Sequence, residues 1–314
     1  MPKKYTLIIF HGKHEPSHLD RGCTLTVQEK LDDAIDTGPD DTEIYIWIDS
    51  PGGDAHAAYK MWLDLRARAS KLRIVIPDVA KSAATLLTLG MDEIYMAPGA
   101  DLGPLDVQIT HPDREEVTVS ALDVVGSLDY FSKFAIELTM TGGAAILRHT
   151  GLSRSEMLHE MLHFTAEFMQ PCVSKIDPSL TRQAYYQLEV AERYAVEMLN
   201  NRNVPEDYVL REHQSRQLAR TLVEAYPVHG FVISANEAVD FHLPVKPLAS
   251  YTRHEQVRKL YRTFSKTLDT LITVIPDSST KKPATSSART RPKGQAKDLP
   301  KKKTGSSKKK AEKS

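Results

Sequence analysis

The stretch IYIWIDSPGGDAHAA, residues 44–58, decides the fold of this chain. Residues 43–49 combine β-branched and aromatic residues and give the clearest strand signal in the sequence. The strand stops at Ser50-Pro51-Gly52-Gly53, and apolar residues at helical spacing follow at once. Two glycines at this junction leave backbone N–H groups that no Cβ shields and that can face a negative charge. An oxyanion hole requires such groups, although a tight turn would also use glycines.

The segments around this junction alternate between strands and helices. We expect strands over 5–10, 43–49, 72–76 and 93–96, and helices over 26–36, 54–69 and 82–89. This alternation predicts parallel strands joined by right-handed crossovers, hence an α/β fold. Beyond residue 118 we expect mainly helix, including one from Pro178 to about residue 200, short strand-like pieces over 230–246, and a last helix over 253–273.

Charge is unevenly distributed along the 314 residues. Residues 281–314 hold 13 Lys and Arg against 2 acids, a net charge of +11, so the rest of this formally neutral chain has −11. The basic segment has one large aliphatic residue, Leu299, which predicts disorder and weak, salt-dependent contact with nucleic acid or another polyanion. We therefore expect an α/β core over 1–118, its mainly helical continuation over 119–276, and a disordered Lys-rich tail over 277–314.

The cysteines and the N-terminal residues bear on cellular location. Cys23 and Cys172 are far apart and fit no metal spacing, which favours a reducing compartment. The longest N-terminal apolar run covers only residues 7–10, too short for a signal peptide or a membrane span. We expect a cytoplasmic protein without a membrane partner.

A second segment of the sequence contains a candidate nucleophile, which an oxyanion hole at the glycine junction would require. In DVAKSAATLLTLG, residues 78–90, Ser82 follows a strand and heads a short apolar helix, with small residues around it. Such a serine is either an N-cap or a nucleophile whose oxyanion the next N–H, that of Ala83, would stabilise.

These residues carry a family resemblance. SPGG after a strand, the Ser82 segment, and YMAPGADLGPLD over 95–106 resemble the Clp and signal-peptide-peptidase class of serine peptidases, which have the ClpP/crotonase superhelix of repeated β-β-α units. The stretches over 174–199 and 226–245 are similar to the serine dehydrogenase proteinase family within that class. The resemblance implies Ser82 as nucleophile, Gly53 and Ala83 as oxyanion donors, substrate contacts at Pro51 and Gly52, a peptide or protein substrate, no cofactor, and a homo-oligomer.

The resemblance leaves the general base open. Where Clp-type members have a histidine, this chain has Leu105 or Asp106, with His111 a few residues late. Signal-peptide-peptidase-like members use a lysine further along, at about the separation of Lys133, and a lysine base must be buried to be neutral. Asp106 is a candidate orienting group, and His229 is a further candidate on the strength of its His-Gly turn alone.

One motif argues for a different chemistry. His159-Glu160-Met161-Leu162-His163 fits the HExxH pattern of zinc proteases. On a helical wheel, however, both histidines belong to one polar face of a helix that we expect to be otherwise buried, so a solvated face explains them. A zinc metalloprotease is therefore an alternative, as is a crotonase-like acyl hydrolase or an inactive binding scaffold of the same fold.

Overall fold

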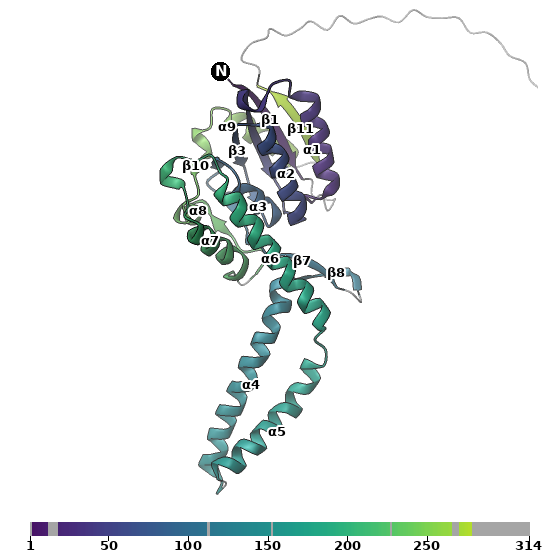
Figure 1. The fold of residues 1–314 in the computed structure, drawn as a ribbon, viewed down its shortest axis with the longest axis vertical. Helices are drawn as coiled ribbons and strands as arrows, with labels where there is room; N and C mark the ends of the chain where they lie inside the picture. Colours follow the sequence, from purple (N-terminus) through teal and green to yellow (C-terminus); the bar gives the residue numbers. More distant parts are fainter. Residues whose placement is uncertain are drawn as a thin grey trace, which may run out of the picture. The chain divides into compact units, whose positions relative to one another are not determined.

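The computed structural model describes residues 2–11, 18–111, 114–151, 153–226, 228–265 and 270–277, without the side chains of 110–118. Its centre is a six-stranded sheet in the order β10-β5-β3-β2-β1-β11 (Figure 1). All neighbours pair in parallel except β1 and β11, which are antiparallel. The strands are β1 Lys3–Phe10, β2 Thr42–Asp49, β3 Lys71–Ile76, β5 Glu93–Met96, β10 Val245–Pro247 and β11 Leu271–Pro276.

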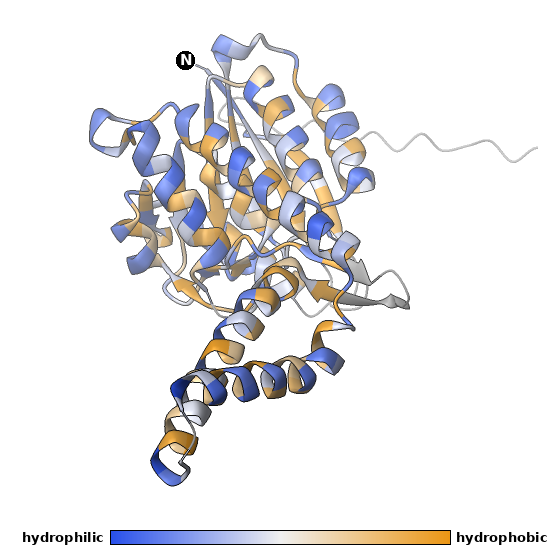
Figure 2. Ribbon diagram, turned by 60° about the horizontal axis from the view of Figure 1, so that its bottom comes forward, coloured by the Kyte–Doolittle hydropathy of each residue, from blue (hydrophilic) through white to orange (hydrophobic). Residues whose placement is uncertain are grey.

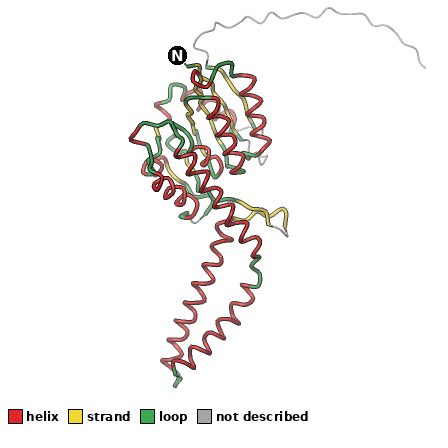
Figure 3. The backbone as a smooth tube through the Cα atoms, viewed as in Figure 1, coloured by secondary structure: helices red, strands yellow, loops and turns green. Residues whose placement is uncertain are grey.

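Helices cover both faces of this sheet, as Figure 3 shows in outline. Alternate residues of β1 and β2 face a large cluster that includes side chains of α1 (Arg21–Ala34), α2 (Ala55–Arg68), α3 (Ala83–Leu89) and α6 (Pro178–Asn200). The other residues, among them Trp47 and Tyr45, form a smaller cluster under η3 (Leu248–Ser250) and α9 (His254–Phe264). Because both faces are covered, the central strands are apolar throughout.

Smaller sheets lie beside the main one. β4 (Val79–Ala80), β6 (Asp101–Leu102) and β9 (Ile233–Ser234) form a three-stranded sheet, and β7 (Gln108–His111) pairs with β8 (Arg114–Ser120). The helices α7 (Glu212–Glu224) and α8 (Ala235–Asp240) and the short turns η1 (Pro39–Asp41) and η2 (Glu206–Tyr208) complete this part of the chain. β4 matters most, because it leads directly into Ser82.

The remaining two helices form a hairpin that extends from the α/β part (Figure 1). They are α4 (Ala121–His149) and α5 (Arg154–Val173), and Figure 2 shows hydrophobic residues along both. On α5 only Met161, Thr165 and Met169 are buried, whereas Leu162 is 54% exposed and Phe168 is 52% exposed. The expectation of an otherwise buried helix is therefore wrong, because a projecting hairpin buries one stripe and leaves the others open.

Two element boundaries also differ from expectation. The first helix starts at Arg21, capped by the Asp20 side chain, rather than at residue 26. The last helix ends at Phe264, and residues 271–276 form β11 instead of continuing it. The sequence LITVIP is rich in β-branched residues, which favour a strand. Pairing with the edge of β1 makes this stretch a strand, although we expected the last helix to continue to residue 273.

Residues up to Asp277 form one compact unit. Of the predicted disordered tail over 277–314, Asp277 belongs to this unit, and residues 278–314 lie outside the described residues. Among the helices that the structure describes, none is both long and apolar enough to cross a membrane.

Candidate active site

The glycine junction is held in place by neighbouring backbone. Gly52 and Gly53 have φ values of +109° and +147°, which favour glycine. A Cβ on Gly52 would lie 2.7 Å from the Cβ of Ser82 and 2.6 Å from the Lys81 carbonyl oxygen. A Cβ on Gly53 would lie 2.6 Å from both the backbone N and O of Leu19. The missing Cβ at Gly52 therefore leaves room for the Ser82 turn. The missing Cβ at Gly53 leaves room for Leu19, which precedes α1.

Ser82 has a strained backbone at the end of β4. Its φ of +48° and ψ of −115° belong to the first central position of a type II′ turn, where glycine is preferred. Ser82 is at the N-cap position of α3, but its side chain makes no capping bond, so the hydroxyl does not have the capping role that was one of its two alternatives. The Oγ instead donates to the Asp106 carbonyl at a long 3.4 Å. A non-glycine residue in such a region costs roughly 1–3 kcal/mol and is concentrated at functional sites.

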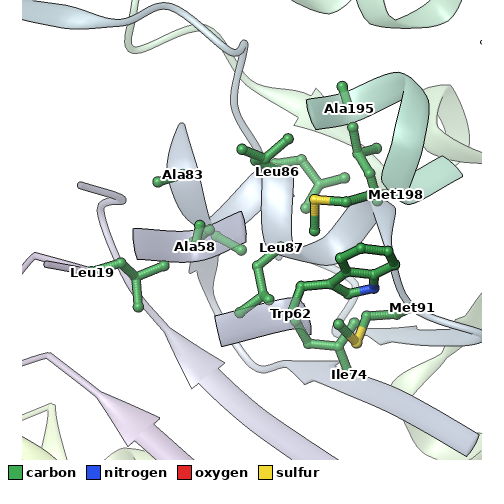
Figure 4. Close-up of a cluster of buried hydrophobic side chains, with 14 of the residues drawn as sticks. Leu19, Ala58, Trp62, Ile74, Ala83, Leu86, Leu87, Met91, Ala195 and Met198 are labelled. Carbon is green, nitrogen blue, oxygen red and sulfur yellow. The ribbon is translucent and has the colours of Figure 1, made fainter. Parts of the chain in front are cut away.

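Two backbone N–H groups near Ser82 are free to bind a ligand. Within the described residues, neither the Gly53 N–H nor the Ala83 N–H donates to an acceptor. Gly53 is exposed and Gly52 is buried, so the second glycine is the one that a bound molecule can reach. Ala83 begins α3 and packs beside Leu86 at the edge of the core shown in Figure 4. These are the two groups that the sequence assigned to an oxyanion hole.

Asp106, whose backbone carbonyl accepts from the Ser82 hydroxyl, brings a carboxylate and an imidazole together. Asp106 is only 3% exposed, and its side chain accepts from Ser120 Oγ at 2.8 Å and from Gln108 Nε2 at 3.1 Å. The same carboxylate lies 3.4 Å from His229 Nδ1. That contact is an ion-pair distance rather than an aligned hydrogen bond, and the nitrogen is buried without another partner among the described residues.

A cavity of about 630 Å³ opens beside these groups. Asp106, Ser120 and His229 line it together with the first turns of α4 and α6. Much of the remaining wall is apolar: Val119, Leu122, Val124, Ile176, Leu180, Tyr226 and Val228. The cavity can therefore hold an extended, partly apolar molecule beside Asp106 and His229.

The other candidate bases are placed differently. Lys133 is exposed on α4 in the single chain, without the burial that a neutral lysine base requires, and its role stays a prediction. His111 ends β7, and its side chain lies outside those that the structure describes. The sequence indicated His229 only through its His-Gly turn. Its contact with Asp106 joins positions 123 residues apart, so no local pattern could reveal it.

The HExxH motif lies on the projecting hairpin. His159, Glu160 and His163 are all exposed on α5, and His163 Nδ1 lies 3.8 Å from Glu167 Oε1. No set of three His, Cys, Asp or Glu side chains suited to a metal occurs among the residues that the structure describes. The solvated-face interpretation remains the simpler account of these histidines.

The chain is similar to known proteins over limited stretches. The uncharacterized proteins MJ1495 and MJ0137 of Methanocaldococcus jannaschii are 37% and 36% identical over 86 residues, which are 27% of this chain and 30% of each relative. The chain thus spans under a third of the curated relatives that it matches. A mutant of the 1510-N membrane-bound stomatin-specific protease, solved with a substrate peptide, superposes with a TM-score of 0.29 at 15% identity. This superposition covers 83% of this chain and 98% of that one, and it is too loose to carry an argument.

The family comparison agrees with the site. Residues 20–125, which include the glycine junction, Ser82 and Asp106, match the family described as ClpP-like SDH-type serine proteinase. The resemblance inferred from the sequence and the α/β fold that it implied are therefore confirmed, with the family match limited to residues 20–125.

Proposed function

We propose that this protein hydrolyses peptide bonds through an acyl-enzyme formed on Ser82. The strained backbone of Ser82 carries the proposal, because its hydroxyl makes a single long bond, to the Asp106 backbone carbonyl, and the N–H of the next residue, Ala83, has no acceptor among the described residues. This conformation gives the protein no capping bond at Ser82, so no such bond offsets the free-energy cost of the strained backbone. In a peptidase this conformation would present the hydroxyl to the substrate carbonyl.

His229 is the base that this geometry favours. Its Nδ1 faces the Asp106 carboxylate, which leaves Nε2 to accept the proton of the Ser82 hydroxyl as Oγ attacks the substrate carbonyl. The negative charge that develops on the carbonyl oxygen would be stabilised by the N–H groups of Gly53 and Ala83. The proton then passes to the leaving amine, and water repeats the sequence to release the acid. Asp106 orients the ring throughout.

Active-site labelling tests this proposal. A fluorophosphonate probe should modify wild-type protein at Ser82, and Ser82→Ala should lose labelling and about 10⁴- to 10⁶-fold of peptidase turnover. Ser127→Ala is the matched control, because Ser127 lines the same cavity and bonds only to the Val124 carbonyl within the described structure. Equal hydrolysis by wild type and a folded Ser82→Ala protein would disprove the nucleophile. The acyl-hydrolase and scaffold alternatives would then lead.

The base has its own test. His229→Ala should lower the labelling rate by about 10²- to 10⁴-fold, as loss of a general base does. Lys133→Ala should leave it unchanged, because that side chain is exposed on α4. Unchanged labelling in His229→Ala, together with a loss of labelling in Lys133→Ala, would identify Lys133 as the general base.

Self-association remains part of the proposal. The hairpin exposes Ile136 (65%) and Met140 (69%) on α4 and Phe168 (52%) on α5. Monomeric proteins rarely leave extended apolar patches in water, so a second copy of the chain would cover these residues. Light scattering should show an oligomer that Met140→Asp weakens. Leu63→Asp, at a 43% exposed leucine on α2, should have no effect.

A further inference from the structure

Lys81 precedes Ser82 in the chain, and its ammonium group is bonded entirely to acceptors of the protein. Its Nζ donates to the Asp101 carboxylate, to the Leu102 carbonyl at 3.0 Å and to the Phe231 carbonyl at 3.0 Å. An ammonium has three N–H donors, so all are used. The side chain is 15% exposed. A lysine held in this way contacts protein acceptors rather than solvent, so we expect it to have a structural or positioning role.

The three acceptors belong to two segments that Lys81 joins to the serine turn. Asp101 and Leu102 form β6, which pairs with β9, and Phe231 lies two residues after His229. On its other side, the Lys81 N–H donates to the Ser50 carbonyl at 3.0 Å, at the start of the glycine junction. A single residue therefore bonds to the junction, to β6 and to the loop of the proposed base.

The His229 loop has few other attachments. Val228 is 59% exposed, and a Cβ on Gly230 would meet no atom within 4 Å. Besides the His229–Asp106 contact, the described bonds and ring contacts of residues 228–231 are the local Phe231 N–H to Val228 carbonyl bond, the Lys81 bond and the packing of Phe231 on Tyr226. The charge-assisted bond from Lys81 is the strongest tie to the nucleophile's own segment.

Gly103 provides the space that the lysine stem needs. A Cβ at this position would lie 2.6 Å from Lys81 Cδ, in the middle of a side chain whose end is held by three bonds. Thr85 fixes the same region, since its Oγ1 donates to the Ala80 carbonyl at 2.6 Å and accepts from the Gly103 N–H at 3.0 Å. The backbone around Lys81 is thus fixed from both sides.

We propose that Lys81 is a positioning residue that sets the distance between Ser82 and His229 by bonding to the Phe231 carbonyl. This inference rests on the proposed peptidase function. It makes the bond to Phe231, rather than the ion pair with Asp101, the one that governs catalysis. A shift of about 1 Å in such a pair can cost about 10²-fold in rate.

The test measures fluorophosphonate acylation of the full chain between pH 5 and 9, separating the maximal rate constant from probe affinity. Lys81→Met/Asp101→Asn removes the ammonium without leaving a buried carboxylate unpaired. It should lower the maximal rate about 10- to 100-fold, with probe affinity unchanged and a flatter pH dependence, because a loose imidazole no longer acts as base. Asp101→Asn alone keeps both carbonyl bonds and should stay within about threefold of wild type.

Two further variants keep the outcome decisive. Gly103→Ala displaces the lysine without changing charge and should cost at least about 10-fold, which decides the question if the double variant fails to fold. Lys71→Met, which removes a lysine paired with Glu93 at 3.1 Å, is the control and should match wild type. Wild-type rates in folded Lys81→Met/Asp101→Asn and in Gly103→Ala, or an equal loss in Asp101→Asn, would overturn the inference. Failure of wild type to label at Ser82 would instead disprove the proposed function.

Discussion

Replacing Ser82 by glycine should abolish activity and make the fold more stable. Ser82 has φ +48° and ψ −115°, a region that costs a residue with a Cβ roughly 1–3 kcal/mol. Glycine adopts this conformation freely, but it loses about 0.5–1 kcal/mol through the greater entropy of its unfolded chain. The Ser82 hydroxyl makes no capping bond and one long 3.4 Å contact, so little else is lost. The net gain should be about 1 kcal/mol, within a range of about 0–2.5 kcal/mol.

Ser82→Ala separates strain from the loss of the hydroxyl. Alanine keeps the Cβ and therefore the strain, so it should unfold within about 0.5 kcal/mol of wild type. Urea unfolding of the three proteins, with the slope checked for constancy, measures these differences. The glycine variant should have the highest midpoint. If Ser82→Gly were no more stable than Ser82→Ala, the strain argument would fail, and with it the main support for Ser82 as a placed nucleophile.

Further expectations concern the junction, a buried carboxylate and the basic tail. Gly52→Ala puts a Cβ 2.7 Å from that of Ser82, so labelling should fall at least about 10²-fold, whereas Gly99→Ala, with no atom within 4 Å, should be silent. Burial raises the pKa of Asp49 from 3.8 to about 6, so the fold loses stability as the pH rises from about 4 to 6. Asp49→Asn should therefore raise the free energy of unfolding in urea at pH 7.5 by up to about 3 kcal/mol, and an equal gain at pH 4 would contradict this cause. Deleting residues 278–314 should remove low-salt retention on immobilised nucleic acid without changing peptidase activity, and a full-length protein that ignores nucleic acid would end this idea.

The sequence predicted the parts of the fold that depend on local pattern. β2, α2, β3, α3 and β5 lie where their alternating or helical spacing placed them, because the apolar residues in each are also the buried ones. β11 was missed because a strand at a sheet edge is decided by its partner, and that partner is more than 260 residues earlier in the chain. The exposed face of α5 was missed for a related reason, since periodicity cannot tell a covered apolar stripe from a bare one.

The candidate site divides in the same way. Gly52, Gly53 and Ser82 could be identified from a short stretch, because turn chemistry is local. The reason for Gly53 was not visible, since its Cβ would clash with Leu19, which only the folded chain brings there. The proposed base, His229, could not be found by counting along the chain, because its contact with Asp106 depends on the pairing of β9 with β6.

The pairing of β1 with β11 has a consequence for how the protein is made. β1 is synthesised before the other strands of its sheet, and its outer edge is closed by residues 271–276, the last of those strands in the chain. Until those residues leave the ribosome, six residues of β1 from Tyr5 to Phe10 present unpaired backbone groups beside an almost fully buried apolar strand. Such an edge recruits other nascent chains, so the protein should depend on chaperones during translation more than its finished stability suggests.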